Sequence, residues 1–317
     1  MPDSPPMLSV ILVNYNTREM TLRCLSALFD DLRDLPAEVW VVDNASTDGS
    51  CAAIRERFPT VKLIENATNA GFGRANNQAM RLAAGRFFML LNTDAFLKPG
   101  ASQAMLEYLN AHPKVGVVGP RLLNADASLQ PSCYRFPSPA RAIFENSWLS
   151  TLLPNHRLIG DYRRWAHDAE RDVDWIVGAC MLLRREVFER TGGFDEAFFM
   201  YSEEADWQRR IRDAGWTVSF TPRAQATHLG GASGANEKAR IHRHFFESLD
   251  HYEQKHHGRI GLLMFRAAMV CGCSIRAVLW MGAWCLPSWR ATACEKIHLH
   301  LWLVKRQATH WPKRVNL

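Results

Sequence analysis

Apolar runs alternate with amphipathic segments over the first hundred residues of the chain. The apolar runs are LSVILVN, EVWVVDN, VKLIE and FFMLLN, and helical periodicity separates them over residues 17–32, 47–58 and 71–84. Continuous apolar strands between amphipathic helices are typical of parallel βαβ units with helices on both faces of the sheet. The pattern predicts an α/β fold with a Rossmann-like, mostly parallel central sheet.

The pattern changes after residue 99. A helix is expected over 99–111 and a strand at GVVG, and the proline-rich stretch 120–172 is expected to form loops over a surface. Order returns with VDWIVGACMLLRREVFERTGGFD, a helix that ends at Gly215 and a strand at TVSF, and the rest is helical from about Asn236. We therefore expect an α/β domain over residues 1–235 and a helical, basic extension over 236–317.

The extension contains an apolar segment, Ile260–Pro287, with Arg266 and Arg276 near its middle. Each central Arg would cost about 2.5–3.5 kcal/mol in a bilayer, so an interfacial hairpin or in-plane helix is favoured over a membrane span. A helix packed on the protein's own surface, or at a homodimer contact, is the equal alternative.

Basic residues accumulate in this extension and contribute to a net charge of +6. They alternate with Trp, Leu, Met and Ile rather than forming a nucleic-acid-binding motif, so an anionic membrane surface is the expected partner and nucleic acid is not. The basic residues are Arg259, Arg266, Arg276, Arg290, Lys296, Lys305, Arg306, Lys313 and Arg314.

Cysteine usage and the N-terminal sequence bear on location. The eight cysteines are scattered without a C-x-x-C pair, which favours a reducing compartment. The first residues have a short apolar run and no basic region before it, unlike a signal peptide. We expect a cytoplasmic protein that lies peripherally on the inner face of the cytoplasmic membrane.

Polar residues follow the predicted strands, where open α/β sheets bind ligands. Asp43, in VVDNASTDGS, can accept a hydrogen bond from the N–H of a pyrimidine base, or it is simply a turn residue. Asp94, in LLNTDA, can give one oxygen to a divalent cation that bridges two phosphates. Asn92 is near enough to touch the ribose or the water shell of that cation.

A third acidic cluster lies at a predicted helix start, in YSEEADW. Glu203, Glu204 and Asp206 suit the positive end of a helix dipole, so capping is one interpretation. The other is that one of the three carboxylates removes a proton from an incoming hydroxyl as general base. The second interpretation is favoured by the apolar residues on both sides.

His228 follows the strand TVSF and precedes two glycines. Its imidazole could complete a metal shell of mixed oxygen and nitrogen ligands, although a lone histidine is more often structural. No role is predicted for a second group of histidines, on a solvated helix or without an acidic partner: His242, His244, His251, His256, His257, His298 and His300.

The segment NAGFGRANN offers glycines and helix N-terminal amides, which favour anions, and its Arg74 could reach a phosphate. G-x-G-x-x-G is absent after the first strand, which disfavours a dehydrogenase. A sugar-1-phosphate nucleotidyltransferase is also disfavoured, because VNYNTRE is not a glycine-rich loop with a basic residue.

Six ordered blocks together resemble one family. VILVNYN, VVDNASTDGS, NAGFGRANNQA, LLNTDA, GACMLLRREVFERTGGFDEAFFMYSEEADWQRRI and HLGGAS are similar to the family 2 inverting glycosyltransferases with a GT-A fold, especially the bacterial rhamnosyltransferase-like members. The resemblance covers about residues 7–235. It implies a nucleotide-binding half over about 7–120 and an acceptor and catalytic half over about 121–235.

The resemblance also implies roles for individual residues. Nucleotide and donor contacts fall on Asn14, Tyr15, Asp43, Arg74, Asn76, Asn92, Thr93, Asp94, Gly178 and Ala179; Mg²⁺ or Mn²⁺ ligands on Asp94 and His228; and the base on Glu204, with Glu203 and Asp206 as alternatives. Two positions depart from the common pattern. Asn92 replaces the first acid of an Asp-x-Asp motif, and Glu204 is one methylene longer than the usual Asp.

The implied activity is transfer of a sugar, with inversion, from a nucleoside-diphosphate sugar of the dTDP-rhamnose or UDP-hexose type. The acceptor would be a saccharide or lipid-linked saccharide in cell-surface polysaccharide synthesis. A non-catalytic nucleotide-sugar-binding or scaffold protein of the same fold is the alternative, disfavoured by the intact acidic clusters.

Overall fold

The computed structural model describes residues 6–154, 156, 158–160, 162, 165–230 and 238–309, with the backbone alone for 238–242. Residues 231–233 of the HLGGAS block, the side chain of His242, and Lys313 and Arg314 lie outside the described residues. The chain forms two compact units, Met1–Phe136 with Tyr162–Phe245 and Pro137–Asp161 with Phe246–Leu317. The second unit thus includes residues 137–161, which the sequence interpretation assigns to the α/β domain.

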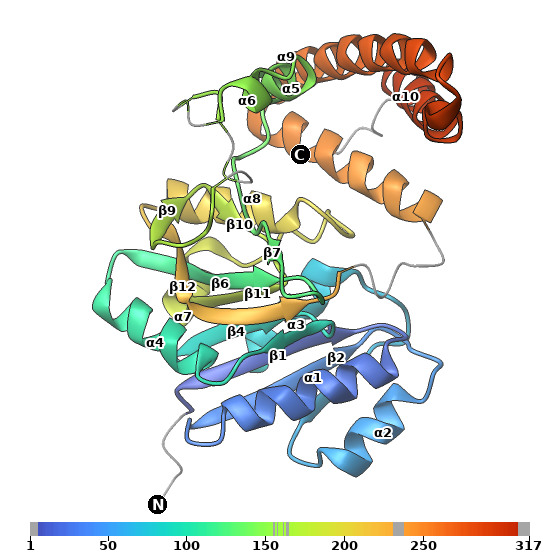
Figure 1. Cartoon of the computed structure of the whole chain (residues 1–317). Coiled ribbons are helices and arrows are strands. Elements are labelled where there is room, and N and C mark those ends of the chain that lie inside the picture. The colour runs from blue at the N-terminus through green and yellow to red at the C-terminus, as the bar shows by residue number, and fades with distance from the viewer. Residues whose placement is uncertain are drawn as a thin grey trace, which may run out of the picture. The chain divides into compact units, whose positions relative to one another are not determined.

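The first unit is built on a ten-stranded sheet, in which eight strands follow the order β3-β2-β1-β4-β11-β6-β12-β5 (Figure 1). The four N-terminal strands are parallel, as their apolar runs predict. They are β1 (Leu8–Asn14), β2 (Ala37–Asp43), β3 (Lys62–Glu65) and β4 (Phe87–Leu91). Beyond them, β11 (Cys180–Arg184) runs antiparallel to both β4 and β6 (Val115–Leu123).

The predicted strand TVSF is the first part of a longer strand, β12 (Thr217–His228). Its pairing with β6 is parallel and shifts register between Thr221 and Gln225, around Pro222, which cannot donate a ladder hydrogen bond. After this irregularity β12 pairs with β5 (Ala95–Leu97), with His228 opposite Ala95. The remaining strands are β7 (Leu129–Gln130) on β6, β9 (Arg171–Val173) on β12, and the separate pair β8 (Cys133–Tyr134) and β10 (Trp175–Ile176).

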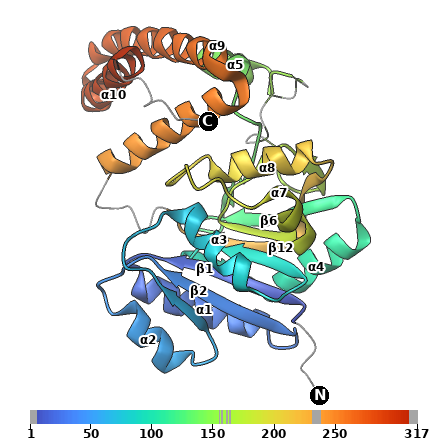
Figure 2. The same cartoon turned by 180° about the vertical axis from the view of Figure 1, so that it is seen from behind.

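Helices cover both faces of the sheet (Figures 1 and 2). On one face Leu25 and Leu28 pack in the same buried cluster as Val10, and on the other Trp207 packs in the same cluster as Phe88. The first layer is α1 (Arg18–Asp31), α2 (Ser50–Arg57) and α4 (Ala101–Ala111), and the second is α3 (Phe72–Leu82), α7 (Arg185–Thr191) and α8 (Glu203–Asp213). The predicted α/β fold, a mostly parallel sheet between helices, is confirmed.

The second unit is helical, as the sequence predicts for the C-terminal region. Its elements are α5 (Pro139–Asn146), α6 (Leu149–Leu152), most of α9 (Lys238–Trp284), η3 (Pro287–Trp289) and α10 (Arg290–Thr309). Ala142 of α5 packs on Leu262 and Phe265 of α9. The helix α9 breaks at Gly258, whose φ of 68° a glycine adopts without the penalty of a side chain.

Two basic residues of this unit are buried rather than exposed to a partner. Arg266 and Arg306 are 4% and 7% exposed, and both donate to Oδ2 of Asp250, at 2.8 and 3.3 Å. Buried guanidinium groups need such a counter-charge. The prediction that Arg266 and Arg306 face an anionic surface is therefore wrong. The prediction of a solvated helix is wrong for the face of α9 that buries Asp250 and Tyr252.

Candidate active site

Asp43 ends β2 and is held by donors from the neighbouring strand and turn. Its Oδ1 accepts a 2.6 Å hydrogen bond from Nδ2 of Asn14, at the end of β1, and its Oδ2 accepts from the N–H of Ser46 at 2.8 Å. Asn14 also donates to the Ser46 hydroxyl at 3.0 Å. Asn14 and Asp43 are both buried, so the network fixes the carboxylate at the strand end.

The same network reaches the end of β4. Oδ1 of Asn14 accepts hydrogen bonds from the hydroxyls of Thr17 and Thr21, and the Thr17 hydroxyl lies 3.1 Å from that of Thr93. Thr17 and Thr21 were not singled out from the sequence; they come three and seven residues after Asn14, Thr17 as the residue that precedes α1 and Thr21 on its first turn. Tyr15 lies half-buried next to Asn14.

The predicted donor-side residues lie together at this edge of the sheet. The backbone N–H of Asn92 donates to the carbonyl of Ala179 at 2.9 Å, because β11 begins where β4 ends. A Cβ at Gly178 would lie 3.6 Å from the ring of Phe72 and 3.9 Å from Cβ of Glu204. The sheet therefore brings Asn92, Gly178 and Ala179 next to the acidic start of α8.

Asp94 and His228 are brought together by the pairing of β5 with β12. Nε2 of His228 lies 3.3 Å from Oδ1 of Asp94, and the N–H of Leu229 donates to the Asp94 carbonyl at 3.0 Å. Nδ1 of His228 faces Oε1 of Gln130 at 2.7 Å. Gln130, which was not predicted from the sequence, thus binds Nδ1 of His228, while Nε2 points at the Asp94 carboxylate.

This pair fits a divalent cation that completes its shell with ligand oxygens. A carboxylate oxygen and an imidazole nitrogen suit Mn²⁺, and Mg²⁺ is commonly held by one or two protein groups together with substrate phosphates. Within the described part of the chain, no group of three or more His, Cys, Asp or Glu side chains could hold a metal ion. Asp94 and His228 are the two described residues whose geometry fits such a cation.

The acidic start of α8 is a buried carboxyl pair. Burial raises the pKa of both Glu203 and Glu204, and the charge of Glu204 raises the Glu203 pKa well above its usual range. Glu204 accepts a hydrogen bond from the N–H of Gly178, which opposes the rise in its own pKa. The pKa of Glu203 is thus raised further by its neighbour, and the Gly178 N–H stabilises the ionised form of Glu204.

The turn before this pair is strained. Tyr201 and Ser202 have φ of 69° and 63°, a left-handed conformation that side-chain-bearing residues rarely adopt. Such strain persists only when surrounding contacts impose it, and it concentrates at functional sites. The turn presents Glu203 and Glu204 as the first residues of α8.

The glycines at the start of α3, Gly71 and Gly73, let the loop that leads to this turn pack closely against the helix. A Cβ at Gly71 would lie 2.5 Å from the carbonyl oxygen of Phe199, and the N–H of Phe72 donates to this oxygen at 3.1 Å. A Cβ at Gly73 would lie 2.9 Å from Phe194. The glycines predicted to favour anions therefore also allow the 194–199 loop to lie directly on α3.

Arg74 and Asn76, on α3, have partners within the protein. Nε of Arg74 lies 3.3 Å from Glu196, and the Arg74 side chain is 61% exposed. Asn76 is buried and donates to the Phe72 carbonyl at 3.0 Å. The predicted contacts of these two residues with a diphosphate or ribose stay a prediction.

Asp206 has different surroundings from the two glutamates. It is fully buried, and its Oδ2 accepts a 3.0 Å hydrogen bond from Nε of Arg210. Arg210 also donates to the carbonyls of Thr191 and Gly193, both at 2.6 Å. Asp206 therefore belongs to a partly buried ion pair with Arg210 that anchors the end of α7.

Two buried asparagines that the sequence interpretation did not single out hold loops of the site. Asn44 donates to the Gly71 carbonyl at 3.2 Å, and Asn77 donates to the Phe194 carbonyl at 2.9 Å while accepting from the Phe194 N–H at 3.0 Å. Asn44 and Asn77 each follow a predicted site residue in the sequence, which could have drawn attention to them. Their hydrogen-bond partners, however, are distant in the sequence and come together only in the folded structure.

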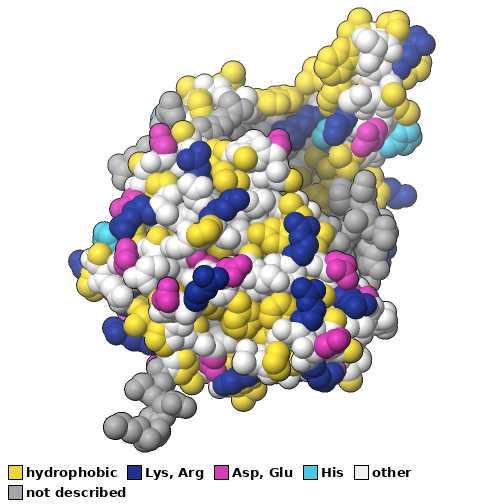
Figure 3. Space-filling view, turned by 60° about the horizontal axis from the view of Figure 1, so that its bottom comes forward, with side chains coloured by type: hydrophobic (Ala, Val, Ile, Leu, Met, Phe, Trp, Pro, Cys, Tyr) yellow, Lys and Arg dark blue, Asp and Glu magenta, His cyan; other side chains and the backbone are white. Residues whose placement is uncertain are grey.

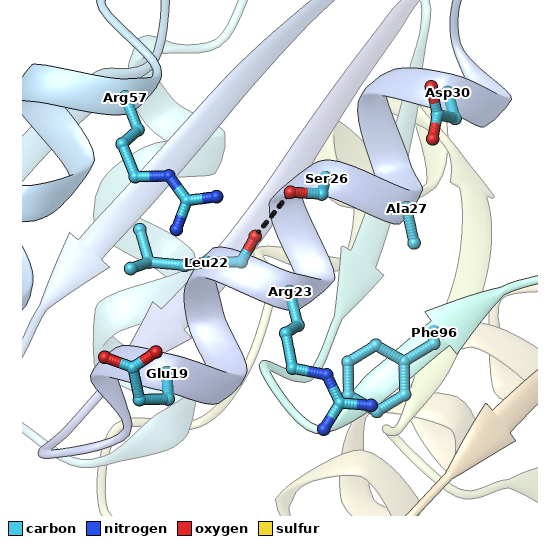
Figure 4. A pocket seen from close by; sticks show the side chains of 8 residues that line it. All are labelled: Glu19, Leu22, Arg23, Ser26, Ala27, Asp30, Arg57 and Phe96. Carbon is cyan, nitrogen blue, oxygen red and sulfur yellow. Dashed lines mark hydrogen bonds between the residues drawn. The ribbon is translucent and has the colours of Figure 1, made fainter.

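A separate surface groove of about 400 Å³ lies along the outer side of α1 (Figure 4). The Arg23 guanidinium lies over the Phe96 ring there, 4.9 Å from its centroid. Figure 3 shows the molecule with the bottom of Figure 1 turned forward. On the face that this figure shows, hydrophobic side chains lie between basic and acidic ones. The groove contains none of the predicted site residues: it is lined by Glu19, Leu22, Arg23, Ser26, Ala27, Asp30, Arg57 and Phe96.

Residues 9–192 match the family model described as glycosyl transferase family 2. The chain belongs to this family and is a glycosyltransferase. It is 32% identical over 245 residues to the N-acetylglucosaminyl-diphospho-decaprenol L-rhamnosyltransferase of Mycobacterium tuberculosis, covering 74% of this chain and 79% of the relative. The resemblance to family 2, including its rhamnosyltransferase-like branch, is confirmed.

Two further similarities are more distant. A low-salt glycan biosynthesis hexosyltransferase of Haloferax volcanii is 26% identical over 231 residues, covering 70% of this chain and 66% of the relative. A mannosyltransferase from Pyrobaculum calidifontis, solved in complex with GDP-Man and Mn²⁺, superposes with a TM-score of 0.58 at 20% identity, covering 97% of this chain and 88% of that one. The structural match supports the GT-A fold.

Proposed function

We propose that this glycosyltransferase transfers a sugar, with inversion, from a nucleoside-diphosphate sugar to a saccharide or lipid-linked saccharide. The observation that carries the proposal is the meeting of three groups at one edge of the sheet: Asp43 at the end of β2, Asp94 after β4, and Glu204 beside Gly178. Such a transfer needs a carboxylate that binds the nucleotide, a ligand for the metal and a general base.

The nucleotide would bind across the ends of β1 and β2. Asp43, held by Asn14 and Ser46, would accept a hydrogen bond from the base N–H. Tyr15 would contact the base or ribose. The diphosphate would lie toward Asn92–Asp94, with Arg74 and Asn76 on its far side and Gly178 and Ala179 near the sugar.

The proton of the acceptor hydroxyl would pass to Glu204. We assign the proton of the pair to Glu203 and the role of base to Glu204, because the Gly178 N–H stabilises the Glu204 carboxylate. The hydroxyl oxygen then attacks C1 of the sugar from the face opposite the nucleotide, and the bond from C1 to the diphosphate oxygen breaks. Asp206 is the weaker candidate for the base because Arg210 already binds it.

Asp94 and His228 would hold Mg²⁺ or Mn²⁺ near the diphosphate. A divalent cation there supplies neutralisation of the negative charge that develops on the leaving group. Asp94 and His228 would hold the cation next to the end of β4.

For the substrates, we propose a dTDP-rhamnose-type donor and a lipid-linked acceptor, with a UDP-hexose as the second candidate. The mycobacterial relative is named for transfer of L-rhamnose to N-acetylglucosaminyl-diphospho-decaprenol, which supports this choice. A thermal-shift screen of dTDP, UDP and GDP and their sugars with Mg²⁺ or Mn²⁺ tests the donor, because a ligand that binds the folded state raises the unfolding midpoint.

A non-catalytic nucleotide-sugar-binding role is the alternative. Incubation of the protein with donor and metal separates the two: an enzyme releases nucleoside diphosphate, slowly to water and faster when an acceptor is added. Binding of donor without any release in the presence of acceptor would contradict catalysis.

We also propose that the helical unit docks on the anionic inner face of the cytoplasmic membrane. One described helix, Arg243–Trp284, is long and apolar enough to cross a membrane by length and composition, which is weak evidence by itself. Its apolar side chains Ile260, Ile275 and Val278 are 74%, 50% and 61% exposed. Exposed Arg259 and Arg290 border this stretch, as anionic lipid would favour.

Flotation with liposomes tests this docking. We expect the full chain to float with vesicles that contain anionic lipid, and less with zwitterionic vesicles or at high salt. Replacing Ile275 and Val278 by Ser should reduce flotation. A homodimer in solution that buries the same side chains, or a protein that resists alkaline carbonate extraction from membranes, would contradict peripheral docking.

A further inference from the structure

Gln130, at the end of β7, is bound on three sides, and the partners determine which way its amide points. Its Nε2 donates to the backbone carbonyl of His228 at 3.1 Å and to Oδ1 of Asn124 at 2.9 Å. A backbone carbonyl can only accept, so the contact with His228 requires the amide nitrogen there.

The second partner gives the same orientation independently. Nδ2 of Asn124 donates to the carbonyl of Leu129 at 3.3 Å and to the Ser128 hydroxyl at 2.9 Å. Because the Leu129 carbonyl can only accept, the nitrogen of Asn124 lies on that side and its oxygen faces Gln130. Reversing the Gln130 amide would place two oxygen pairs against each other.

The orientation of Gln130 dictates the tautomer of His228. Oε1 of Gln130 lies 2.7 Å from Nδ1 of His228 and cannot donate, so Nδ1 carries the hydrogen. In the neutral imidazole Nε2 is then an acceptor, and it points toward Oδ1 of Asp94 at 3.3 Å. Two lone pairs face each other, an arrangement that an intervening cation would relieve.

We propose that Gln130 is a positioning residue: it holds His228 as the Nδ1–H tautomer and directs the Nε2 lone pair toward Asp94. The bonds to both the ring and the backbone carbonyl of His228 fix the tautomer and the end of β12 together. The tautomer is set by this environment rather than by the imidazole ring itself, because the hydrogen bond at one ring nitrogen determines which nitrogen is protonated. The role in metal binding rests on the proposed function.

The first test reads the tautomer without any metal. Full-length protein labelled with ¹⁵N-histidine is examined by long-range ¹H–¹⁵N correlation at about two pH units above the ordinary imidazole pKa of ~6.5. We expect His228, assigned by its loss in His228→Asn, to show protonated Nδ1. Gln130→Leu should convert the signal to the other tautomer or a mixture.

The second test measures Mn²⁺ affinity by electron paramagnetic resonance. Loss of an outer partner of a metal-binding histidine typically weakens metal affinity about 10- to 100-fold. We expect this loss in Gln130→Leu and no change in the control Gln103→Leu, whose exposed amide donates to Glu107. Circular dichroism checks that each variant is folded.

The two tests separate the two claims. A wild-type spectrum with protonated Nε2, or one that Gln130→Leu leaves unchanged in a folded protein, overturns the inference. A wild-type protein that has the Nδ1–H tautomer but binds no Mn²⁺, with or without nucleoside diphosphate, contradicts the metal role in the proposed function and leaves the tautomer assignment standing.

Discussion

Nε2 of His228 lies 3.3 Å from Oδ1 of Asp94, although Asp94 follows the fourth strand and His228 ends the last one. The contact depends on β5, which follows Asp94 and pairs antiparallel with the end of β12. Both side chains are largely buried, so the proposed metal ligands are set by the sheet rather than by a mobile loop.

Removing either ligand should abolish most metal-dependent transfer. A cation that stabilises the leaving group contributes several kcal/mol, and about 3 kcal/mol corresponds to a loss of about 10²-fold in rate. We expect Asp94→Ala and His228→Ala to lower kcat by at least this factor at saturating Mn²⁺. Glu107→Gln, an exposed ion-pair residue on α4, is the control. Full activity in Asp94→Ala would rule out the metal role.

Glu204→Gln should remove the proposed base and leave substrate binding intact. General base catalysis contributes about 10²- to 10⁴-fold, so we expect kcat to fall by that range with KM nearly unchanged. Glu203→Gln should cost much less, since an amide can replace the protonated carboxyl. Steady-state kinetics with donor and acceptor measures both. A larger loss in Glu203→Gln than in Glu204→Gln would exchange the two assignments.

The pH profile should report the raised pKa of Glu204. The base acts only when ionised, and burial raises its pKa above the usual ~4.3 of a glutamate. Activity is therefore lost as pH falls through this raised pKa, at a higher pH than for an exposed carboxylate. We expect kcat/KM to decline on the acid side at a pH above ~4.3. A profile that stays flat down to that value would contradict a buried base.

The N-terminal half of the fold was predictable because its strands are continuous apolar runs. The central strands β1 and β4 are buried on both faces, as parallel strands between helix layers must be, whereas the edge strand β3 is partly exposed. The antiparallel direction of β11 was not predictable from its residues, since an apolar run reads the same in either direction. Direction depends on the connection before the strand, and here residues 137–161 of that connection leave the α/β unit.

The site was predictable where it consists of strand-end acids and not where it consists of their partners. Asp43 and Asp94 follow apolar strands, so their edge of the sheet follows from topology. Gln130 acquires its role only through contact with His228, 98 residues away, which no local pattern encodes, whereas Thr17 lies only three residues after Asn14. Arg266 was misassigned for the same reason: its counter-ion Asp250 is sixteen residues away.

Asp43→Asn should weaken nucleotide binding without a large loss of folding. Hydrogen bonds to a charged group contribute about 1.5–3 kcal/mol, which corresponds to about 10- to 150-fold in affinity. We expect this increase in the Kd of the nucleoside diphosphate by calorimetry. Asp48→Asn, which alters the same turn without reaching β2, is the matched control. Equal affinity in wild type and Asp43→Asn would exclude a contact with the base.

Glu253 of α9 should make the folded protein less stable as pH rises. Burial, together with the charge of Asp250, raises its pKa to about 8, and neither carboxyl oxygen has a hydrogen-bond partner among the described residues. The pKa in the folded state lies above the ~4.3 of the unfolded chain, so the folded state holds a proton that the unfolded chain releases. This contribution to stability is complete below ~4.3 and is lost as pH rises to about 8.

Glu253→Gln, which mimics the protonated carboxyl, should therefore raise the thermal unfolding midpoint more at pH 8 than at pH 5. Nε2 of His257 lies 4.0 Å from the Glu253 carboxyl. A protonated His257 favours the ionised form of Glu253, and it would therefore reduce the advantage of Glu253→Gln over the wild type at low pH. Differential scanning calorimetry at the two pH values measures the effect, with the exposed Glu295→Gln on α10 as control. A shift of equal size at both pH values would mean that Glu253 ionises in the folded protein as it does in the unfolded chain.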